Sequence, residues 1–260
     1  MHTVPNNLAR TTVELYGAAG VEWLSHLPSL LAACAERWGL TILPPFANLS
    51  YNYVAPAVRA GGTEVVLKAG VPNPELRTEI EALWLFAGQG SVLLLEADAE
   101  LGLLLLERLR PGTPLVFLAD DREATSVAAG VMRQLWRPAP ALHPFPTAAR
   151  WAAGLLRLRR QLGGGTGPFP RVLVERAEGL FAKLIASSAE PVLLHGDLHH
   201  KNILRAGRQP WLAVDPKGLV GEPAYEVGAL LRNPYPQILQ EPQVEDILAR
   251  RADQLAEELN

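Results

Sequence analysis

The spacing of hydrophobic residues changes near Pro111–Gly112, and this change constrains the fold of the 260-residue chain more than any other feature. Before that point, short apolar runs alternate with turn residues in the manner of β-strands. After it, apolar residues recur with helical spacing, at Trp151, Leu155, Leu158 and Leu162 and again at Leu173, Ala177, Leu180 and Leu184. We therefore predict an α+β fold with a strand-rich first part, a mainly helical second part and a cleft near residues 107–113.

The strand-rich part is predicted to contain a small antiparallel sheet and one helix. Residues 50–69 alternate on either side of Gly61–Gly62, which is typical of two strands joined by a turn. A helix is predicted next, where four apolar residues share one helical face: Leu76, Ile80, Leu83 and Ala87. Two further short strands are predicted at 92–95 and 103–106.

Composition and charge disfavour several classes of protein. With 48% hydrophobic residues and a net charge of −3, the chain is predicted to be globular, without the basic surface that binds nucleic acid or an anionic membrane. The single cysteine, Cys34, cannot form an internal disulfide, and no apolar run approaches the roughly 20 residues that span a bilayer. Because the N-terminus lacks the pattern of a secretory signal, we expect a cytoplasmic protein. The oligomeric state stays open.

The densest group of polar residues lies in the string HGDLHHKNIL, His195–Leu204, which is followed by the segment Trp211–Asp215. Asp197 and Asn202 stand five residues apart, and the two apolar runs that follow predict a hairpin that returns Asp215 to the side of Asn202. Phosphoryl transfer from ATP needs a carboxylate that takes the hydroxyl proton and oxygen ligands that hold Mg²⁺, and protein kinases supply them with this Asp-to-Asn spacing. The string therefore predicts an ATP- and Mg²⁺-dependent phosphotransferase.

Two other interpretations of this string stay open. Its polar residues would be ordinary turn residues and strand ends in a chain without this activity. Alternatively, His195, His199 and His200 would belong to a zinc site, because imidazole is the commonest metal ligand, although Cys34 is remote in sequence. In the favoured interpretation His195 fixes the loop, whereas His199 and His200 face phosphate or substrate.

The string and the segment WLAVDPKGLVGEPAYEVGALLRNP resemble the signature of the aminoglycoside phosphotransferase family, and within it the streptomycin 6-kinase and hydroxyurea kinase group. The resemblance implies a two-lobed protein-kinase-like fold, with a nucleotide-binding lobe at 1–108 and a helical catalytic and substrate-binding lobe at 109–260. It also implies that Asp197 is the catalytic base and that Asn202 and Asp215 bind Mg²⁺.

The same resemblance implies roles for three neighbouring residues. Glu226 would be a structural carboxylate that braces the catalytic loop. Lys217 and Glu222 would lie on the phosphate or substrate side.

Contacts to the nucleotide are predicted in the first lobe. Lys68 ends an apolar strand, where kinases place the ammonium that binds the α and β phosphates. Glu79 on the next helix is predicted to hold this ammonium, with Glu81 as the alternative. Ser50 and the main chain of the loop Asn48–Tyr53 are predicted to cover the phosphates, although this loop lacks the glycines of the protein-kinase version.

The segment after residue 106 resembles the family's link between lobes. Main-chain groups there, including those of Glu107 and Leu109, would pair with adenine. A plain strand that leads into a turn is the alternative interpretation.

We therefore predict an enzyme that moves the γ-phosphate of ATP to a hydroxyl of a polar, cationic small molecule. Streptomycin is the best candidate for this acceptor, and its phosphorylation would cause antibiotic resistance. A metabolite kinase of the same fold, or a truncated nucleotide-binding protein with little activity, is the alternative.

Family members continue beyond the point that matches Ala256, so we expect the family's C-terminal end to be missing and apolar surface to be exposed. Four acidic residues either line a cationic pocket or form a solvated face: Glu222, Glu241, Glu245 and Asp246.

Overall fold

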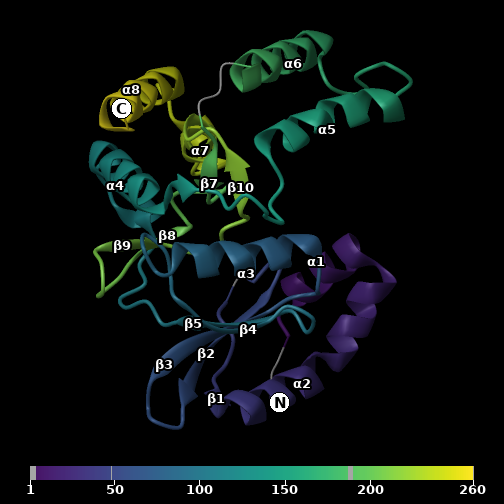
Figure 1. The fold of residues 1–260 in the computed structure, drawn as a ribbon, viewed down its shortest axis with the longest axis vertical. Coiled ribbons are helices and arrows are strands. Elements are labelled where there is room, and N and C mark those ends of the chain that lie inside the picture. Colours follow the sequence, from purple (N-terminus) through teal and green to yellow (C-terminus); the bar gives the residue numbers. More distant parts are fainter. Residues whose placement is uncertain (1–3, 48, 187–189, 260) are drawn as a thin grey trace. The chain divides into compact units, whose positions relative to one another are not determined.

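The fold is described by a computed structural model that covers residues 4–47, 49–186 and 190–259 (Figure 1). The predicted α+β class is confirmed, because an antiparallel sheet dominates the first part of the chain and helices dominate the second. None of the helices in these three ranges is long and apolar enough to cross a membrane.

The chain folds as two compact units. Unit 1 comprises Met1–Thr113 and Leu204–Leu212, and unit 2 comprises Pro114–Ile203 and Ala213–Asn260. Unit 1 contains α1 (Asn6–Tyr16), α2 (Ala18–Trp38), β1 (Leu40–Ile42), β2 (Tyr53–Arg59), β3 (Glu64–Ala69), α3 (Pro74–Phe86), β4 (Leu94–Asp98) and β5 (Leu103–Glu107). The chain passes between the units along β8 (Ile203–Arg205) and β9 (Trp211–Ala213), which pair as the hairpin that the sequence predicts.

The sheet of unit 1 has the strand order β1-β2-β3-β5-β4, and every neighbouring pair is antiparallel. Strands β2 and β3 form the predicted hairpin, with Tyr53 opposite Ala69. Helix α3 covers one face of the sheet and α2 the other (Figure 1). Because side chains alternate along a strand, Val65 and Leu67 of β3 enter the core beneath α2, whereas Lys68 points toward α3.

Helices α1 and α2 were not predicted. Their signal was present, since the buried residues Trp23, Leu27, Leu31 and Cys34 of α2 follow one another with helical spacing. Helix α2 ends at Gly39, whose φ of 63° lies in the left-handed region that favours glycine. These two helices complete a core that a hairpin and one helix would have left open on one side.

Strand β4 begins two residues later than predicted, at Leu94. The N–H of Leu93 donates to the side chain of Glu107 at 2.9 Å, and the ladder between β4 and β5 is irregular between Leu94 and Glu96. A local hydrogen bond and a bulge, neither visible in the apolar pattern, therefore shift the strand.

Unit 2 is mainly helical around a small sheet of order β10-β7-β6. Its elements are α4 (Asp121–Leu135), β6 (Arg137–Pro138), α5 (Ala148–Gln161), α6 (Arg171–Ala186), β7 (Val192–Leu194), β10 (Leu219–Gly221), α7 (Ala224–Leu231) and α8 (Val244–Leu259), with single 3₁₀ turns at Leu115–Phe117 and Gln237–Gln240. Helices α5 and α6 are the two that the helical spacing predicts.

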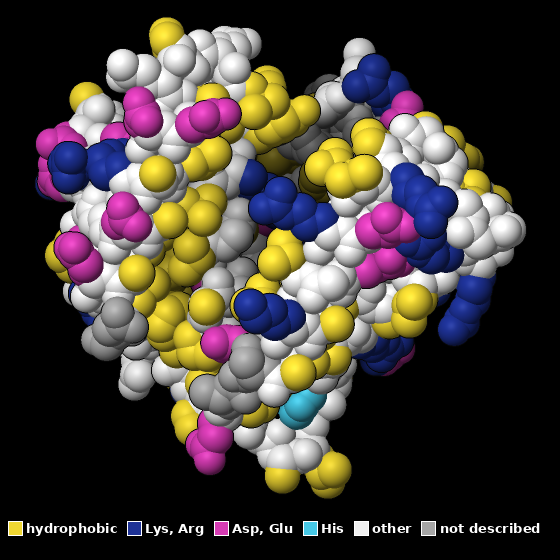
Figure 2. Space-filling view, turned by 90° about the horizontal axis from the view of Figure 1, so that it is seen from above, with side chains coloured by type: hydrophobic (Ala, Val, Ile, Leu, Met, Phe, Trp, Pro, Cys, Tyr) yellow, Lys and Arg dark blue, Asp and Glu magenta, His cyan; other side chains and the backbone are white. Residues whose placement is uncertain are grey.

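Helices α5 and α6 are covered only in part. No residue of α5 is buried, and Val174 is the one buried residue of α6. Large hydrophobic side chains are exposed on the two helices: Leu156, Val172, Leu173, Leu180, Leu184 and Ile185. Figure 2 shows hydrophobic side chains at the surface among charged ones.

Candidate active site

The loop that carries Asp197 follows directly after β7 and is fixed by one buried carboxylate. Glu226, in the first turn of α7, accepts the N–H groups of His195 at 2.7 Å and Gly196 at 3.0 Å. Gly196 has a φ of 84°, and a Cβ there would stand 3.2 Å from the Cβ of Leu219. Burial raises the pKa of Glu226 to about 7, against the effect of these N–H donors. The contacts are those expected of a carboxylate that braces the loop.

His195 joins this loop to the segment that carries Asp215. Its ring Nε2 lies 2.9 Å from the carbonyl oxygen of Val214, and its own carbonyl accepts the N–H of Lys217 at 2.8 Å. The side chain is fully buried, and burial lowers its pKa to about 4. The neutral ring therefore serves as a structural link, as predicted. Asp215 itself has a φ of 58°, an uncommon conformation for a residue with a side chain.

Asn202 links the loop of Asp197 to Val214, the residue before Asp215. Its Nδ2 donates to the carbonyl of Asp197 at 3.1 Å, and its own carbonyl accepts the N–H of Val214 at 2.9 Å. The hairpin thus returns Asp215 to the side of Asn202. In the described part of the chain no group donates to Oδ1 of Asn202, which leaves that oxygen available as a ligand. An amide oxygen and a carboxylate are ligands that Mg²⁺ prefers, so these residues fit the ion, and their role as ligands stays a prediction.

The histidines next to Asn202 do not form a metal cluster. No group of three or more His, Cys, Asp or Glu side chains gathers as a metal site among the residues that the structure describes, so the zinc interpretation gains no support. His199 is partly exposed, and its Nδ1 accepts the N–H of Lys201 at 3.2 Å. His200, which was predicted to face phosphate or substrate, is instead only 3% exposed.

The buried ring of His200 should make the protein sensitive to acid. Neither ring nitrogen has a hydrogen-bond partner among the described residues, and burial, aided by the charge of Arg251, lowers its pKa from 6.5 to about 4. As the pH falls, His200 is therefore protonated in the unfolded chain before it is protonated in the folded one. The free energy of unfolding consequently decreases as the pH falls from 6.5 toward 4. His200→Leu is expected to reduce that loss by about 2 kcal/mol in urea unfolding followed over this pH range. The control is His26→Leu, which removes an exposed ring, and an equal effect of both variants would contradict this account.

In unit 1, Lys68 and Glu79 form a buried ion pair. Nζ of Lys68 lies 2.5 Å from Oε1 of Glu79, and the two residues are 3% and 6% exposed. Glu81, the alternative partner, is exposed. The ammonium is therefore held at the end of β3, where a kinase presents it to phosphates.

The loop predicted to cover the phosphates is tied to α1. Nδ2 of Asn7 donates to the carbonyl of Leu49 at 3.2 Å and to Oγ of Ser50 at 3.4 Å. Asn48, at the start of this loop, lies outside the described residues. The contact of Ser50 with phosphate stays a prediction.

In the segment predicted to bind adenine, the side chains of Glu107 and Leu109 contact the protein itself. The carboxylate of Glu107 accepts the N–H of Leu93 and an N–H of Arg208, at 2.9 Å and 2.7 Å, and the main-chain N–H of Glu107 donates to the carbonyl of Leu93. Leu109 is buried, and no described residue accepts its main-chain N–H. That N–H fits the predicted contact with adenine, which stays a prediction.

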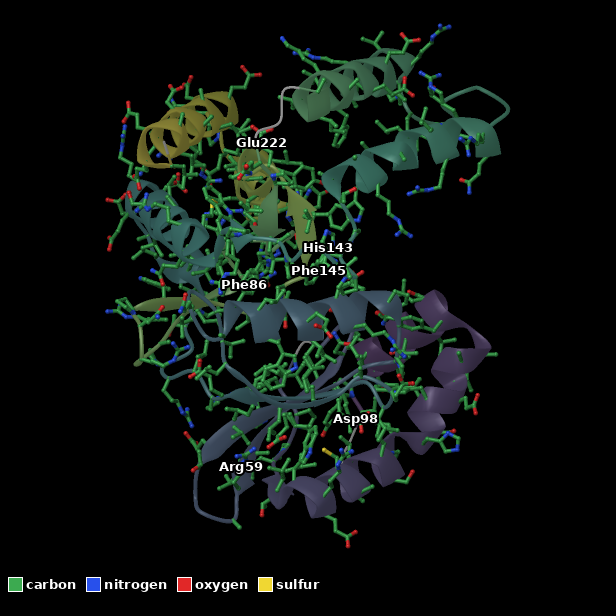
Figure 3. All side chains as sticks on the ribbon, in the orientation of Figure 1. Arg59, Phe86, Asp98, His143, Phe145 and Glu222 are labelled. Carbon is green, nitrogen blue, oxygen red and sulfur yellow. The ribbon has the colours of Figure 1, made fainter. Side chains whose placement is uncertain are left out.

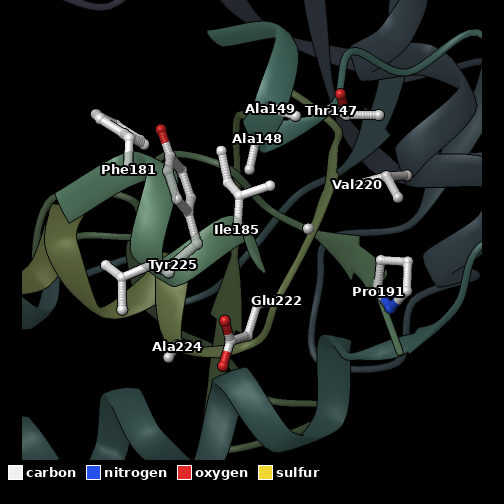
Figure 4. Close-up of a pocket in the computed structure, with 12 residues that line it drawn as sticks. Thr147, Ala148, Ala149, Phe181, Ile185, Pro191, Val220, Glu222, Ala224 and Tyr225 are labelled. Carbon is white, nitrogen blue, oxygen red and sulfur yellow. The ribbon is translucent and has the colours of Figure 1, made fainter. Parts of the chain in front are cut away.

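Glu222 lines a cavity of about 450 Å³ in unit 2 (Figure 4). The lining is mostly apolar and includes Phe181, Ile185 and Tyr225. Figure 3 labels Glu222 and also His143 with Phe145, two rings that stack at 5.7 Å in the segment before α5. The other acidic residues that the sequence singled out are exposed: Glu241, Glu245 and Asp246.

Three side chains without a predicted role contact the predicted site residues. Asn7 bonds to Ser50, Arg208 bonds to Glu107, and Arg232 lies 3.2 Å from the carboxylate of Asp197. Of these three, only Arg232 could have been noticed in the sequence, because it is a lone basic residue at the end of an apolar helical stretch.

Comparison with known proteins identifies the protein family to which the chain belongs. Residues 45–260 match the family model described as aminoglycoside/hydroxyurea antibiotic resistance kinase. The chain belongs to this family. A streptomycin 6-kinase of Streptomyces glaucescens is 33% identical over 98% of the chain and 83% of the relative. A hydroxyurea phosphotransferase of Kitasatospora aureofaciens is 38% identical over 88% of the chain and 68% of the relative.

The fold of this family member is also found in solved kinases. An aminoglycoside phosphotransferase in ternary complex with ADP and hygromycin B superposes with a TM-score of 0.59 at 15% identity, over 86% of this chain and 83% of that one. The protein-kinase-like fold is thereby confirmed. The protein is a kinase that phosphorylates a hydroxyl group and uses ATP.

Proposed function

We propose that this kinase transfers the γ-phosphate of ATP to a hydroxyl of a small-molecule antibiotic, with Asp197 as base and Asn202 and Asp215 as ligands of Mg²⁺. The observation that carries the proposal is the link through Asn202, whose side chain holds the Asp197 loop and whose main chain holds the strand before Asp215. This link supports the proposal, because it joins the loop of Asp197 to the residue before Asp215 within unit 2.

Each residue has a defined task in the proposed reaction. Asp197 orients the hydroxyl and takes its proton, and Asn202 and Asp215 hold the metal ion. Lys68 binds the phosphates from its position beside Glu79. The ion, when bound, neutralises charge on the phosphates.

The acceptor is proposed from the named relatives. Streptomycin, the candidate that the sequence favours, and hydroxyurea are both supported, because the relatives named for them match most of this chain. The test is an assay of ADP formation with ATP, Mg²⁺ and each compound, with choline as the metabolite control. ADP formation that depends on an antibiotic supports the proposal, and stimulation by choline alone would point to a metabolite kinase.

The buried ion pair of unit 1 gives a prediction with a matched control. Glu79→Gln is expected to raise the KM for ATP about 10-fold, because Lys68 loses the charged partner that holds it. Glu81→Gln, a change of the same chemistry on the same helix at an exposed position, should leave the KM unchanged. Steady-state kinetics with varied ATP measures both, and an equal effect of the two variants would show that the pair has no part in nucleotide binding.

Lys68→Met is expected to raise the KM for ATP further, by about 10- to 100-fold, since it removes the charge-assisted contact itself. It also leaves the carboxylate of Glu79 buried without its partner in this pair, which is destabilising. The double variant Lys68→Met/Glu79→Gln removes that unpaired charge. A double variant that is stable and still binds ATP normally would contradict the role of Lys68.

A further inference from the structure

The carboxylate of the proposed base has a neighbour that no prediction included. Among the described side chains, only Arg232 contacts the Asp197 carboxylate, with Nη2 3.2 Å from Oδ1. The contact is open to solvent, since the side chains of Arg232 and Asp197 are 67% and 25% exposed. An acceptor that approaches Asp197 therefore meets this guanidinium as well.

The main chain on either side of Arg232 is fixed by a second, buried arginine. Arg251 of α8 is 2% exposed and donates to the carbonyls of Leu230 at 3.4 Å and Asn233 at 2.7 Å. Asp121 binds the opposite side of the Arg251 guanidinium. The end of α7 is thus held in place, while the long side chain of Arg232 reaches out of it toward Asp197.

The guanidinium of Arg232 has more N–H donors than its contact with Asp197 uses. Arginine carries five N–H donors in one plane, and in the described part of the chain only Asp197 accepts one from Arg232. The contact occupies Oδ1 of Asp197, so Oδ2 is left for the hydroxyl of an acceptor. An oxygen next to that hydroxyl would meet the remaining N–H groups.

The charges around Asp197 also select against some acceptors. The guanidinium of Arg232 is the positive charge that contacts the Asp197 carboxylate. One cationic side chain thus lies beside the base. An ammonium or guanidinium group on the acceptor would be repelled there, whereas an uncharged oxygen would not.

We propose that Arg232 determines acceptor specificity, and that it selects uncharged acceptors whose reactive hydroxyl stands beside a carbonyl oxygen, as in hydroxyurea and hydroxamates. The inference rests on the proposed kinase function and names the acceptor class of the same site. The hydroxyl binds Oδ2 of Asp197 while the neighbouring carbonyl accepts from Arg232.

The transfer step balances with these groups in place. The hydroxyl oxygen forms a bond to the γ-phosphorus as its proton passes to Oδ2 of Asp197. The bond between the γ-phosphorus and the bridging oxygen breaks, and its electron pair leaves with ADP. Arg232 keeps its charge throughout and orients the acceptor through the carbonyl.

The experiment compares two acceptors across three variants. kcat/KM is measured for hydroxyurea and for streptomycin with the wild-type chain, Arg232→Met, Arg232→Lys and the control Arg160→Met. Arg160 is an exposed arginine of α5, so its replacement changes the net charge equally, away from Asp197. Because the two acceptors are compared in the same preparation, partial misfolding of a variant cancels in their ratio.

We expect the wild-type chain to prefer hydroxyurea. Arg232→Met should lower kcat/KM for hydroxyurea about 10- to 100-fold without lowering that for streptomycin, and Arg232→Lys should lie between. Arg160→Met should keep the wild-type ratio.

Three results would overturn the inference. A wild-type preference for streptomycin, or an equal loss of both activities in Arg232→Met, would show that Arg232 does not select the acceptor, while the kinase proposal would stand. Absence of transfer to either acceptor would also overturn it. ADP formation with other hydroxyl compounds, measured in parallel, then shows whether the kinase proposal falls too.

Discussion

Asp197→Asn is expected to lower phosphate transfer by about 10²- to 10⁴-fold, because it removes the proton acceptor and keeps the size of the side chain. ATP should still bind, since the predicted nucleotide contacts of unit 1, including the pair of Lys68 and Glu79, are unchanged. Added Mg²⁺ should not restore turnover, because the missing group handles the proton.

Asp215→Asn should fail in a different way. It removes a metal carboxylate, so the affinity for ATP in the presence of Mg²⁺ should fall, and a higher concentration of Mg²⁺ should restore part of the transfer. The measurement is nucleotide affinity and transfer for both variants across a titration of Mg²⁺. If Asp197→Asn loses metal-dependent affinity while Asp215→Asn keeps it, the two roles are reversed.

Arg251→Met is expected to destabilise the protein by about 3 kcal/mol. The guanidinium of Arg251 is almost fully buried, binds Asp121 and caps the carbonyl end of α7, so its loss leaves several polar groups without a partner. Burial raises the pKa of Asp121, but the bonds from Arg251 and Arg250 outweigh it and lower the pKa below its ordinary value. The pair is therefore an interaction of charged groups across α4 and α8.

The matched control is the neighbouring arginine. Arg250 also binds Asp121, but its side chain is 21% exposed and does not reach the end of α7. Arg250→Met should cost less than about 1 kcal/mol, as partly exposed ion pairs do. Urea unfolding followed by tryptophan fluorescence measures both variants, and equal losses would show that the capping of α7 contributes nothing.

The parts of the fold that sequence could predict are those with a strong local pattern. The β2–β3 hairpin follows from strand alternation about Gly61–Gly62, and α3, α5 and α6 follow from helical spacing. The pairing of Lys68 with Glu79 follows from the alternation that turns Lys68 toward α3. In each case neighbours in sequence determine the contact.

Contacts between distant segments could not be predicted in this way. Arg251 is separated by 130 residues from its partner Asp121, and Arg232 by 35 residues from its partner Asp197. Because most arginines in proteins are exposed to solvent, the local sequence around these two gave no indication that either would contact a distant carboxylate. The burial of His200 could not be predicted for a related reason. Its place in a polar string suggested exposure, but the packing of the helical unit buries it.

The identity of the reaction product is the decisive test of the proposed phosphate transfer. Wild-type protein is incubated with ATP, Mg²⁺ and hydroxyurea or streptomycin, and the acceptor is analysed by mass spectrometry while ADP is measured in the same sample. We expect an acceptor that has gained one phosphoryl group, that forms in equal amount with ADP, and that forms far more slowly with the Asp197→Asn variant. Unmodified acceptors with ADP and free phosphate, or equal product from wild-type and Asp197→Asn protein, would contradict this expectation.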